Sequence, residues 1–381
     1  MISTNNDIVY RKLFDIEIKS LEAQGNSCDN WDKIRVKEGF DPLRIHNSTF
    51  IGEIKIGIFT DKLLTYENLQ LPTGIYNSMI VSSMIGDNCA VHNAKYISDY
   101  TIENNVLIFN IDELSISDNP LFGHGHLKED GSRNKIALIN ENGNRSILPF
   151  KGIKTADAYL WSKYRGNSEL IDMFRRFTDN LQDSAKNYNS SAMGHIGSFS
   201  VLRSCRIIKD VNFGDYSRIS GISRLENLTI DSSEENPSVI GEDSDLENGI
   251  IGYGTTIRHG VKASNFILGN FSNLKYGARF FDSYLAENSA IACCEVQNSL
   301  LFPFHEQHHN NSFLIASCLQ GQSNIAAGST IGSNHNSRGA DGEIYANRGF
   351  WTALSSSLKH NSKFASFTLL GKNDFQYEMD I

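Results

Sequence analysis

A large apolar residue recurs every five or six positions through residues 250–302, and glycine, asparagine, serine and aspartate fill the intervals. A helix requires apolar residues three and four apart, and a half-buried strand alternates every two, so neither produces this spacing. A six-residue period with turn-forming residues indicates a β-solenoid, in which each short strand contributes one inward side chain before a corner. Ten positions follow this period, nine of them large and apolar and one an alanine: Ile251, Ile257, Ala263, Leu268, Leu274, Phe280, Leu285, Ile291, Val296 and Leu301.

The period also sets the length of a coil. Three steps take 17, 17 and 16 residues, from Ile251 to Leu268, Leu285 and Leu301. Three short faces per coil predict a triangular prism. We therefore expect an all-β solenoid, a left-handed parallel β-helix of hexapeptide repeats with a helical insertion. The same period recurs, sometimes more weakly, in residues 79–108, 196–225, 240–251 and 319–331.

The interruption between the two solenoid sections has helical spacing. Residues 155–187 carry apolar side chains three and four apart, with Asn167 or Ser168 placed to cap a helix. Two turn signals in residues 123–150 predict β-hairpins, and residues 15–25 predict a short helix ended by Gly25. The predicted organisation has four parts: a mixed segment at 1–48, a short β-helix section with hairpins at 49–154, the helical insertion at 155–190 and the main β-helix at 191–381.

Composition narrows the classes of function. The 381 residues are 40% hydrophobic and 21% charged, with a formal net charge of −9 and no basic cluster interleaved with aromatic residues. The chain therefore lacks the basic surface that would attract the phosphates of a nucleic acid, and we do not expect nucleic-acid binding. No apolar run approaches the roughly 18 residues of a membrane helix, and the N-terminus does not resemble a signal peptide, so we expect a cytoplasmic protein with no membrane insertion.

Histidine and asparagine gather near the end of the chain. The stretch HEQHHNNSF occupies residues 305–313, and an Asn-Ser pair recurs 25 residues apart at 311–312, 336–337 and 361–362. Imidazole exchanges protons near neutral pH, and carboxamides hold carbonyls or hydroxyls with paired donors and acceptors. We therefore select His309, His335 and His360 as candidate catalytic residues, and His308, Asn310, Asn311, Asn336, Arg338, Lys359 and Asn361 as candidate substrate-binding residues.

Two other interpretations stay open. Asparagine is common at solenoid corners, where it tolerates left-handed backbone, so the Asn-Ser pairs are also explained by structure alone. Three of the histidines His305, His308, His309 and His335 could bind zinc and leave one position for water. The Asn-Ser pairs recur every 25 residues, which does not match the coil length, so the three pairs need not lie on the same edge of the prism. We expect residues 304–311 to interrupt the solenoid, and separated copies to converge across a homo-oligomeric interface, a trimer being favoured.

The hexads IGDNCA, LGNFSN, LAENSA and IAAGST resemble the hexapeptide-repeat transferases. Longer stretches, including LENGIIGYGTTIRHG (246–260) and GQSNIAAGSTIGSNHNSRGADGEI (321–344), resemble an uncharacterised family of Bacteroidetes and spirochaetes, sometimes labelled as related to sugar-nucleotide pyrophosphorylases. That family's members are longer than this chain. The glycine loop of the pyrophosphorylase catalytic domain does not occur here. The transferase resemblance implies a histidine general base, an acyl-CoA co-substrate and a sugar acceptor.

We therefore expect transfer of an acyl group from acetyl-CoA, another CoA or a carrier thioester to a sugar, amino sugar or nucleotide sugar. His309 or His335 would act as the base, Asn311, Asn336 and Asn361 would position the acceptor or the thioester carbonyl, and Arg338 and Lys359 would meet a phosphate. The alternatives are a metal-dependent hydratase or hydrolase of the γ-carbonic-anhydrase type, and a sugar-nucleotide-binding scaffold without turnover.

Overall fold

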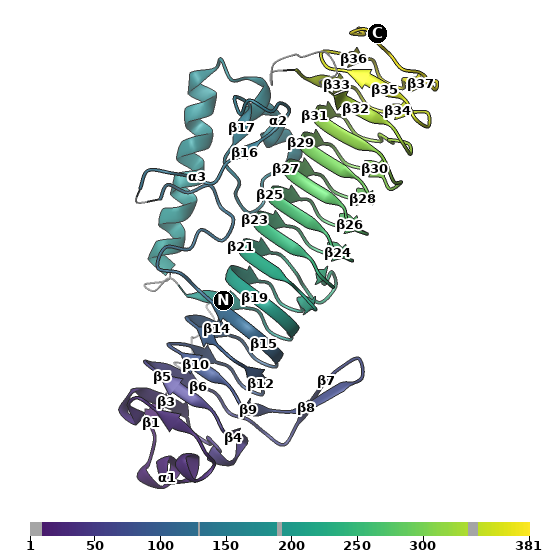
Figure 1. Cartoon of the computed structure of the whole chain (residues 1–381). Coiled ribbons are helices and arrows are strands. Elements are labelled where there is room, and N and C mark those ends of the chain that lie inside the picture. The colour runs from purple at the N-terminus through teal and green to yellow at the C-terminus, as the bar shows by residue number, and fades with distance from the viewer. Residues whose placement is uncertain (1–9, 129, 189–192, 334–341) are drawn as a thin grey trace. The chain divides into compact units, whose positions relative to one another are not determined.

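The computed structural model describes residues 10–128, 130–188, 193–333 and 342–381 (Figure 1). The chain divides into two compact units, residues 1–118 with 191–221, and residues 119–190 with 222–381. Both units are built of short parallel strands in successive coils, which confirms the predicted β-solenoid.

The first unit begins with a helix and continues as coils. Helix α1 (Asp15–Ala23) ends two residues before Gly25, whose φ of 80° fits the predicted terminator. Val91 pairs with Ile108 and Ile85 with Ile102, as the weaker upstream repeat predicts. The strands are β1 (Tyr10–Lys12), β2 (Ser27–Cys28), β3 (Ile34–Lys37), β4 (Ile45–His46), β5 (Thr49–Ile51), β6 (Ile54–Ile56), β7 (Leu63–Tyr66), β8 (Leu69–Pro72), β9 (Gly74–Tyr76), β10 (Met79–Val81), β11 (Met84–Ile85), β12 (Ala90–Ala94), β13 (Ile97–Ser98), β14 (Tyr100–Ile102), β15 (Leu107–Ser115), β18 (Gly194–Ile196), β19 (Val201–Phe213) and β20 (Arg218–Ser220).

The second unit holds the more regular coils. Ile251 pairs with Leu268, Leu268 with Leu285 and Leu285 with Leu301, which confirms the predicted coil length. The strands are β16 (Ile136–Ala137), β17 (Ser146–Ile147), β21 (Arg224–Ile230), β22 (Val239–Ile240), β23 (Asp245–Ile251), β24 (Thr256–Arg258), β25 (Lys262–Leu268), β26 (Asn273–Lys275), β27 (Arg279–Leu285), β28 (Ala290–Ala292), β29 (Glu295–Leu301), β30 (Glu306–Gln307), β31 (Phe313–Leu319), β32 (Thr330–Ser333), β33 (Ile344–Ala346), β34 (Trp351–Thr352), β35 (Ser357–Lys359), β36 (Lys363–Phe364) and β37 (Leu369–Leu370).

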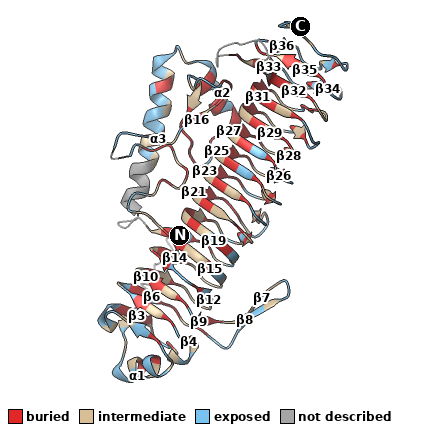
Figure 2. Cartoon of the chain, in the orientation of Figure 1, coloured by how far each residue is buried: buried red, intermediate tan, exposed pale blue. Residues whose placement is uncertain are grey.

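The core of each coil is a stack of inward aliphatic side chains. The seven-residue strands β21, β23, β25, β27 and β29 share one burial pattern from their second residue onward, and their buried positions are red in Figure 2. Corners are made by residues with positive φ, many of them asparagine. Asn227, Asn248 and Asn265 form such a row, and their side chains hydrogen-bond to one another at 2.7 and 3.2 Å. Local backbone geometry therefore explains much of the asparagine content.

The prediction that residues 304–311 interrupt the solenoid is wrong in part. Glu306 and Gln307 form β30, which pairs in register with Ala290 and Ile291 of β28. A short polar strand remains in register because its neighbours supply the backbone hydrogen bonds. The motif is therefore a rung followed by a corner, and its side chains alternate between the interior and the surface.

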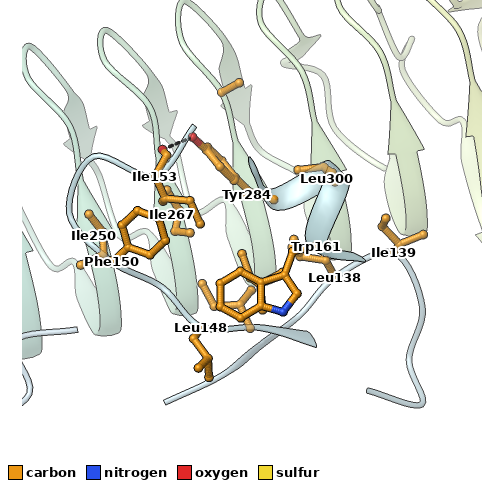
Figure 3. Packing of buried hydrophobic residues seen from close by; sticks show 14 of the residues in the cluster. Leu138, Ile139, Leu148, Phe150, Ile153, Trp161, Ile250, Ile267, Tyr284 and Leu300 are labelled. Carbon is orange, nitrogen blue, oxygen red and sulfur yellow. Dashed lines mark hydrogen bonds between the residues drawn. The ribbon is translucent and has the colours of Figure 1, made fainter. Parts of the chain in front are cut away.

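The insertion packs on the solenoid strands of the second unit. Helices α2 (Thr155–Lys163) and α3 (Ser168–Tyr188) occupy the predicted range, and the Asn167 side chain accepts a hydrogen bond from the Leu170 backbone N–H. Strands β16 and β17 form an antiparallel hairpin. Trp161 is buried among aliphatic side chains, and Tyr284 donates a hydrogen bond of 2.9 Å to the Ile153 carbonyl (Figure 3). Apolar burial and this buried bond fix the insertion to the solenoid.

Candidate functional site

The histidine-rich rung has an unusual interior. Backbone hydrogen bonds place Ser272, Ser289, His305 and Ser323 on successive coils at one inward position, so His305 replaces a small serine. The His305 ring is fully buried, and its Nδ1 lies 2.8 Å from the Ser323 hydroxyl. Burial lowers the pKa of His305 to about 4, because the interior disfavours the charged ring. His305 is therefore a neutral interior residue at neutral pH.

Gln307 adds a second interior polar group. Its side-chain nitrogen donates to the Ser312 hydroxyl at 3.2 Å, and the residue is fully buried. The His305 Nε2 atom and the Gln307 Oε1 atom are both buried without a hydrogen-bond partner in the described part of the chain. The coil thus contains a polar layer where its neighbours have serine and aliphatic side chains.

Two outward side chains of the same rung, Glu306 and His308, have the arrangement of a general base. The His308 Nδ1 atom lies 3.2 Å from a Glu306 carboxylate oxygen, and both side chains are about half exposed. His309 lies beside them, with its ring centroid 4.4 Å from that of His308. A carboxylate on one ring nitrogen fixes the tautomer and leaves the other nitrogen available to accept a proton. Glu306 and His308 therefore form a carboxylate–histidine dyad on the surface.

A groove of about 520 Å³ has the Glu306 carboxylate of this dyad in its lining and crosses successive coils. Glu306 pairs with Asn324, and Asn324 pairs with Trp351 on the next coil. Trp351 pairs in turn with Leu369. The lining residues combine exposed aromatic rings with carboxylate and carboxamide groups: Phe304, Glu306, Gln322, Ser323, Asn324, Gly349, Trp351, Phe367 and Leu369. We refer to this hollow as the aromatic groove.

Glycine and short hydrogen bonds shape the aromatic groove. Gly349 has a φ of 80°, and a Cβ there would meet the Phe367 ring at 2.7 Å, so no larger residue fits without moving the ring. The Arg348 guanidinium donates to the Gln322 side-chain oxygen at 2.9 Å. The Trp351 indole N–H donates to the Gln322 carbonyl at 3.3 Å. These contacts orient the aromatic walls before any ligand arrives.

The other predicted residues are dispersed. Asn311 and Asn361 both occupy corners with positive φ, at 58° and 65°. The Asn310 carbonyl accepts a backbone hydrogen bond from the Gly328 N–H, whereas the Asn361 backbone N–H donates to the Glu343 carbonyl. The Asn-Ser pairs at 311–312 and 361–362 therefore lie on different corners of the solenoid. Lys359 ends β35. Three predicted residues lie outside the described ranges: His335, Asn336 and Arg338.

His360 is buried rather than open to a ligand. Its side chain lies beside Gly342 and Gly332, where a Cβ would come within 2.7 Å of the imidazole. The Nε2 atom lies 3.4 Å from the Ile315 carbonyl oxygen. The structure therefore joins His308 with His309, and places His305 and His360 in separate buried surroundings.

A metal centre has no assembled ligand set in the described residues, where no group of three His, Cys, Asp or Glu side chains has suitable spacing. Within the same ranges, no helix combines the length and apolar character needed to cross a membrane. The sequence did not predict the aromatic wall formed by Phe304, Trp351 and Phe367. Phe304 and Phe367 occupy corners with positive φ, and Trp351 begins β34, so the three residues share no single spacing.

The family model described as "Domain of unknown function (DUF4954)" matches residues 10–379. The chain is also 48% identical over 376 residues to an uncharacterized protein of Treponema pallidum (strain Nichols). That match covers 98% of this chain and 51% of the relative, so the chain spans about half the relative's length. These similarities support the expected uncharacterised bacterial family. They do not bear on the hexapeptide-repeat or pyrophosphorylase labels.

Proposed function

The chain belongs to the DUF4954 family, and we propose that it binds a sugar or amino sugar in the aromatic groove and transfers an acyl group to it. The observation that carries this proposal is that Glu306, the carboxylate beside His308, lines a groove with aromatic walls. Family membership supplies no activity, so the proposal depends on the chemistry of these side chains.

The lining of the aromatic groove suits a sugar ring. A pyranose presents C–H groups on its faces and hydroxyl groups around its edge. Exposed rings such as Trp351 and Phe304 can cover the faces, while the Asn324 and Gln322 side chains and the Glu306 carboxylate can meet the hydroxyls. The volume lies in the range of about 300–1,000 Å³ typical of small-molecule sites.

The dyad suits general-base chemistry. His308 would remove the proton from an acceptor hydroxyl or amine as that atom attacks the thioester carbonyl. The carbonyl carbon forms its new bond to oxygen or nitrogen, the carbon–sulfur bond breaks, and the proton passes from His308 to the leaving thiolate. Glu306 would orient the ring and stabilise the imidazolium. CoA or a carrier thioester supplies the acyl group.

The other predicted residues have subordinate or untested roles in this proposal. His309 adjoins His308 and could replace it as the base, whereas His360 lacks access to a ligand. The roles of His335, Asn336 and Arg338 stay predictions, as does the trimer. Metal-dependent hydrolysis is less favoured, because His305 is buried with Nδ1 against Ser323. A sugar-binding scaffold without turnover would use the same aromatic groove.

Sugar binding is tested by titrating methyl glycosides and free amino sugars while recording tryptophan fluorescence, to which the groove residue Trp351 contributes. Phe304→Ala should weaken binding about tenfold through loss of an aromatic wall. Phe271→Ala is the matched control, since Phe271 is an exposed residue with similar positive φ that does not line the groove. No saturable binding by any sugar, or equal losses in both variants, would overturn the proposed site.

Acyl transfer is tested by thiol release from acetyl-CoA in the presence of a bound sugar. His308→Gln should reduce the rate at least about a hundredfold, as expected for a general base, without changing sugar affinity. His195→Gln, at an exposed histidine of the first unit, should leave the rate unchanged. Sugar binding without thiol release from acetyl-CoA or another acyl thioester would replace transfer with the scaffold function.

A further inference from the structure

We propose that a second cavity, between helix α2 and the solenoid strands of the second unit, binds a phosphorylated small molecule. This cavity has a volume of about 400 Å³. Its polar lining comes from Tyr159 and Lys163 of the helix, from Gln320, Tyr345, Asn347 and Lys363 of the solenoid, and from the carboxylate of Asp380. We refer to it as the lysine cavity. It shares no lining residue with the aromatic groove, so it is independent of the proposed sugar site.

Two ammonium groups give the lysine cavity its charge. The Lys163 Nζ atom lies 4.1 Å from the centroid of the Tyr345 ring, and Lys163 forms no ion pair with the residues that the structure describes. Lys363 faces only a weak counter-charge, because its Nζ is 4.0 Å from Asp380 and both side chains are largely exposed. An anionic ligand would supply the missing partner for Lys163.

Several hydrogen-bond donors surround these cations. The Tyr345 hydroxyl oxygen is buried beside the Glu343 carboxylate, so the ring of Tyr345, rather than its hydroxyl, forms part of the wall. Burial and the Glu343 carboxylate raise the pKa of Tyr345, so its hydroxyl stays protonated and adds no negative charge beside the cavity. Gln320 and Asn347 add carboxamide donors. A phosphate monoester offers three terminal oxygens to such a set, whereas a carboxylate offers two and leaves more donors unpaired.

The walls of the lysine cavity are held in place by packing and charge. The Tyr159 ring meets Phe302 edge-on at 5.9 Å, which attaches the helix to the solenoid. The Arg145 guanidinium donates hydrogen bonds to the Glu343 carboxylate at 2.8 Å and to the Ser162 carbonyl at 3.1 Å. It therefore connects Glu343, the residue before β33, to the end of α2. The Glu343 carboxylate is thereby neutralised by Arg145 rather than left to repel an anion. A preorganised cavity loses less free energy on binding.

The experiment is calorimetric titration of the full chain with glycerol 3-phosphate, with glycerol and succinate as matched probes. None of these probes contains a sugar ring, so the result does not depend on the aromatic groove. We expect saturable binding of glycerol 3-phosphate alone. Lys163→Gln should weaken it about tenfold or more, the loss of one charge-assisted contact. Lys154→Gln, at the exposed N-cap of the same helix, should have no effect.

Lys363→Gln separates binding from folding. The Lys363 side chain is largely exposed and lies 4.0 Å from Asp380, so the melting temperature should not fall, while affinity for glycerol 3-phosphate should drop several-fold. The proposal is overturned if glycerol 3-phosphate does not bind at millimolar concentration. It is also overturned if succinate binds equally well, or if Lys163→Gln and Lys154→Gln bind as wild type does.

Discussion

At the scale of single residues, burial separates the histidines of the HEQHH motif into two kinds. His305 lies inside the coil and is neutral, whereas His308 and His309 are on the surface. The sequence shows where each histidine lies along the chain, but it does not show whether the side chain faces the interior or the surface. That direction depends on β30 being a rung, because side chains alternate along a strand. The Glu306–His308 pair follows from the same alternation.

The buried His305 should make stability depend on pH. Its folded pKa of about 4 lies below the ordinary value of about 6.5, so between these pH values the unfolded chain binds a proton that the folded chain does not. The free energy of unfolding should therefore decrease as pH falls through this window, by about 2 kcal/mol between pH 6.5 and 5. Urea unfolding at several pH values measures the decline.

His305→Ser, which restores the serine of adjoining coils, should remove this part of the pH dependence. Burial also lowers the pKa of His124 to about 4, so the variant should retain a smaller slope than wild type rather than none. His195→Ser changes an exposed histidine and should preserve the wild-type slope. Parallel curves for wild type and His305→Ser would contradict the assignment of a neutral buried ring.

At the scale of elements, the repeat was predictable and the corner chemistry was ambiguous. The period of six identified inward positions because a solenoid buries one aliphatic residue per face, and the strand register agrees with it. The same period could not show that Trp351 and Phe367 would line one groove. Their coils are separated by stretches of differing length, so sequence spacing does not reveal which outward positions become neighbours.

Substitution by glycine distinguishes a corner role from a substrate role for Asn361. Its φ of 65° is readily adopted by glycine, so Asn361→Gly should change stability by less than about 1 kcal/mol, whereas Asn361→Val should cost about 1–2 kcal/mol. Thermal unfolding measures both. If the carboxamide instead positions a substrate, Asn361→Gly will retain stability and lose sugar binding. Asn288→Gly, at a corner with a φ of 55°, controls for the backbone effect.

At the scale of the whole molecule, the division of the chain into two compact units implies separable stability. Each coil of a solenoid contacts mainly its neighbours, so a local defect need not destabilise distant coils. Helix positions were predictable from three-and-four spacing, but the surface that the insertion covers was not. The contacts of Trp161 and Tyr284 join segments more than a hundred residues apart, and neither segment's pattern specifies the other.

Truncating the Trp161 side chain should therefore destabilise the second unit without destabilising the first. The indole is buried in the cluster that fixes the insertion to the solenoid, so Trp161→Ala should cost about 3–5 kcal/mol there. Hydrogen exchange followed by mass spectrometry should show faster exchange in peptides from residues 155–165 and 281–301, and unchanged exchange in peptides from residues 80–108. Trp31→Ala, in the first unit, should give the converse pattern. Equal acceleration in both units would show instead that the chain opens as one cooperative body, in which case no substitution in either unit could be interpreted locally.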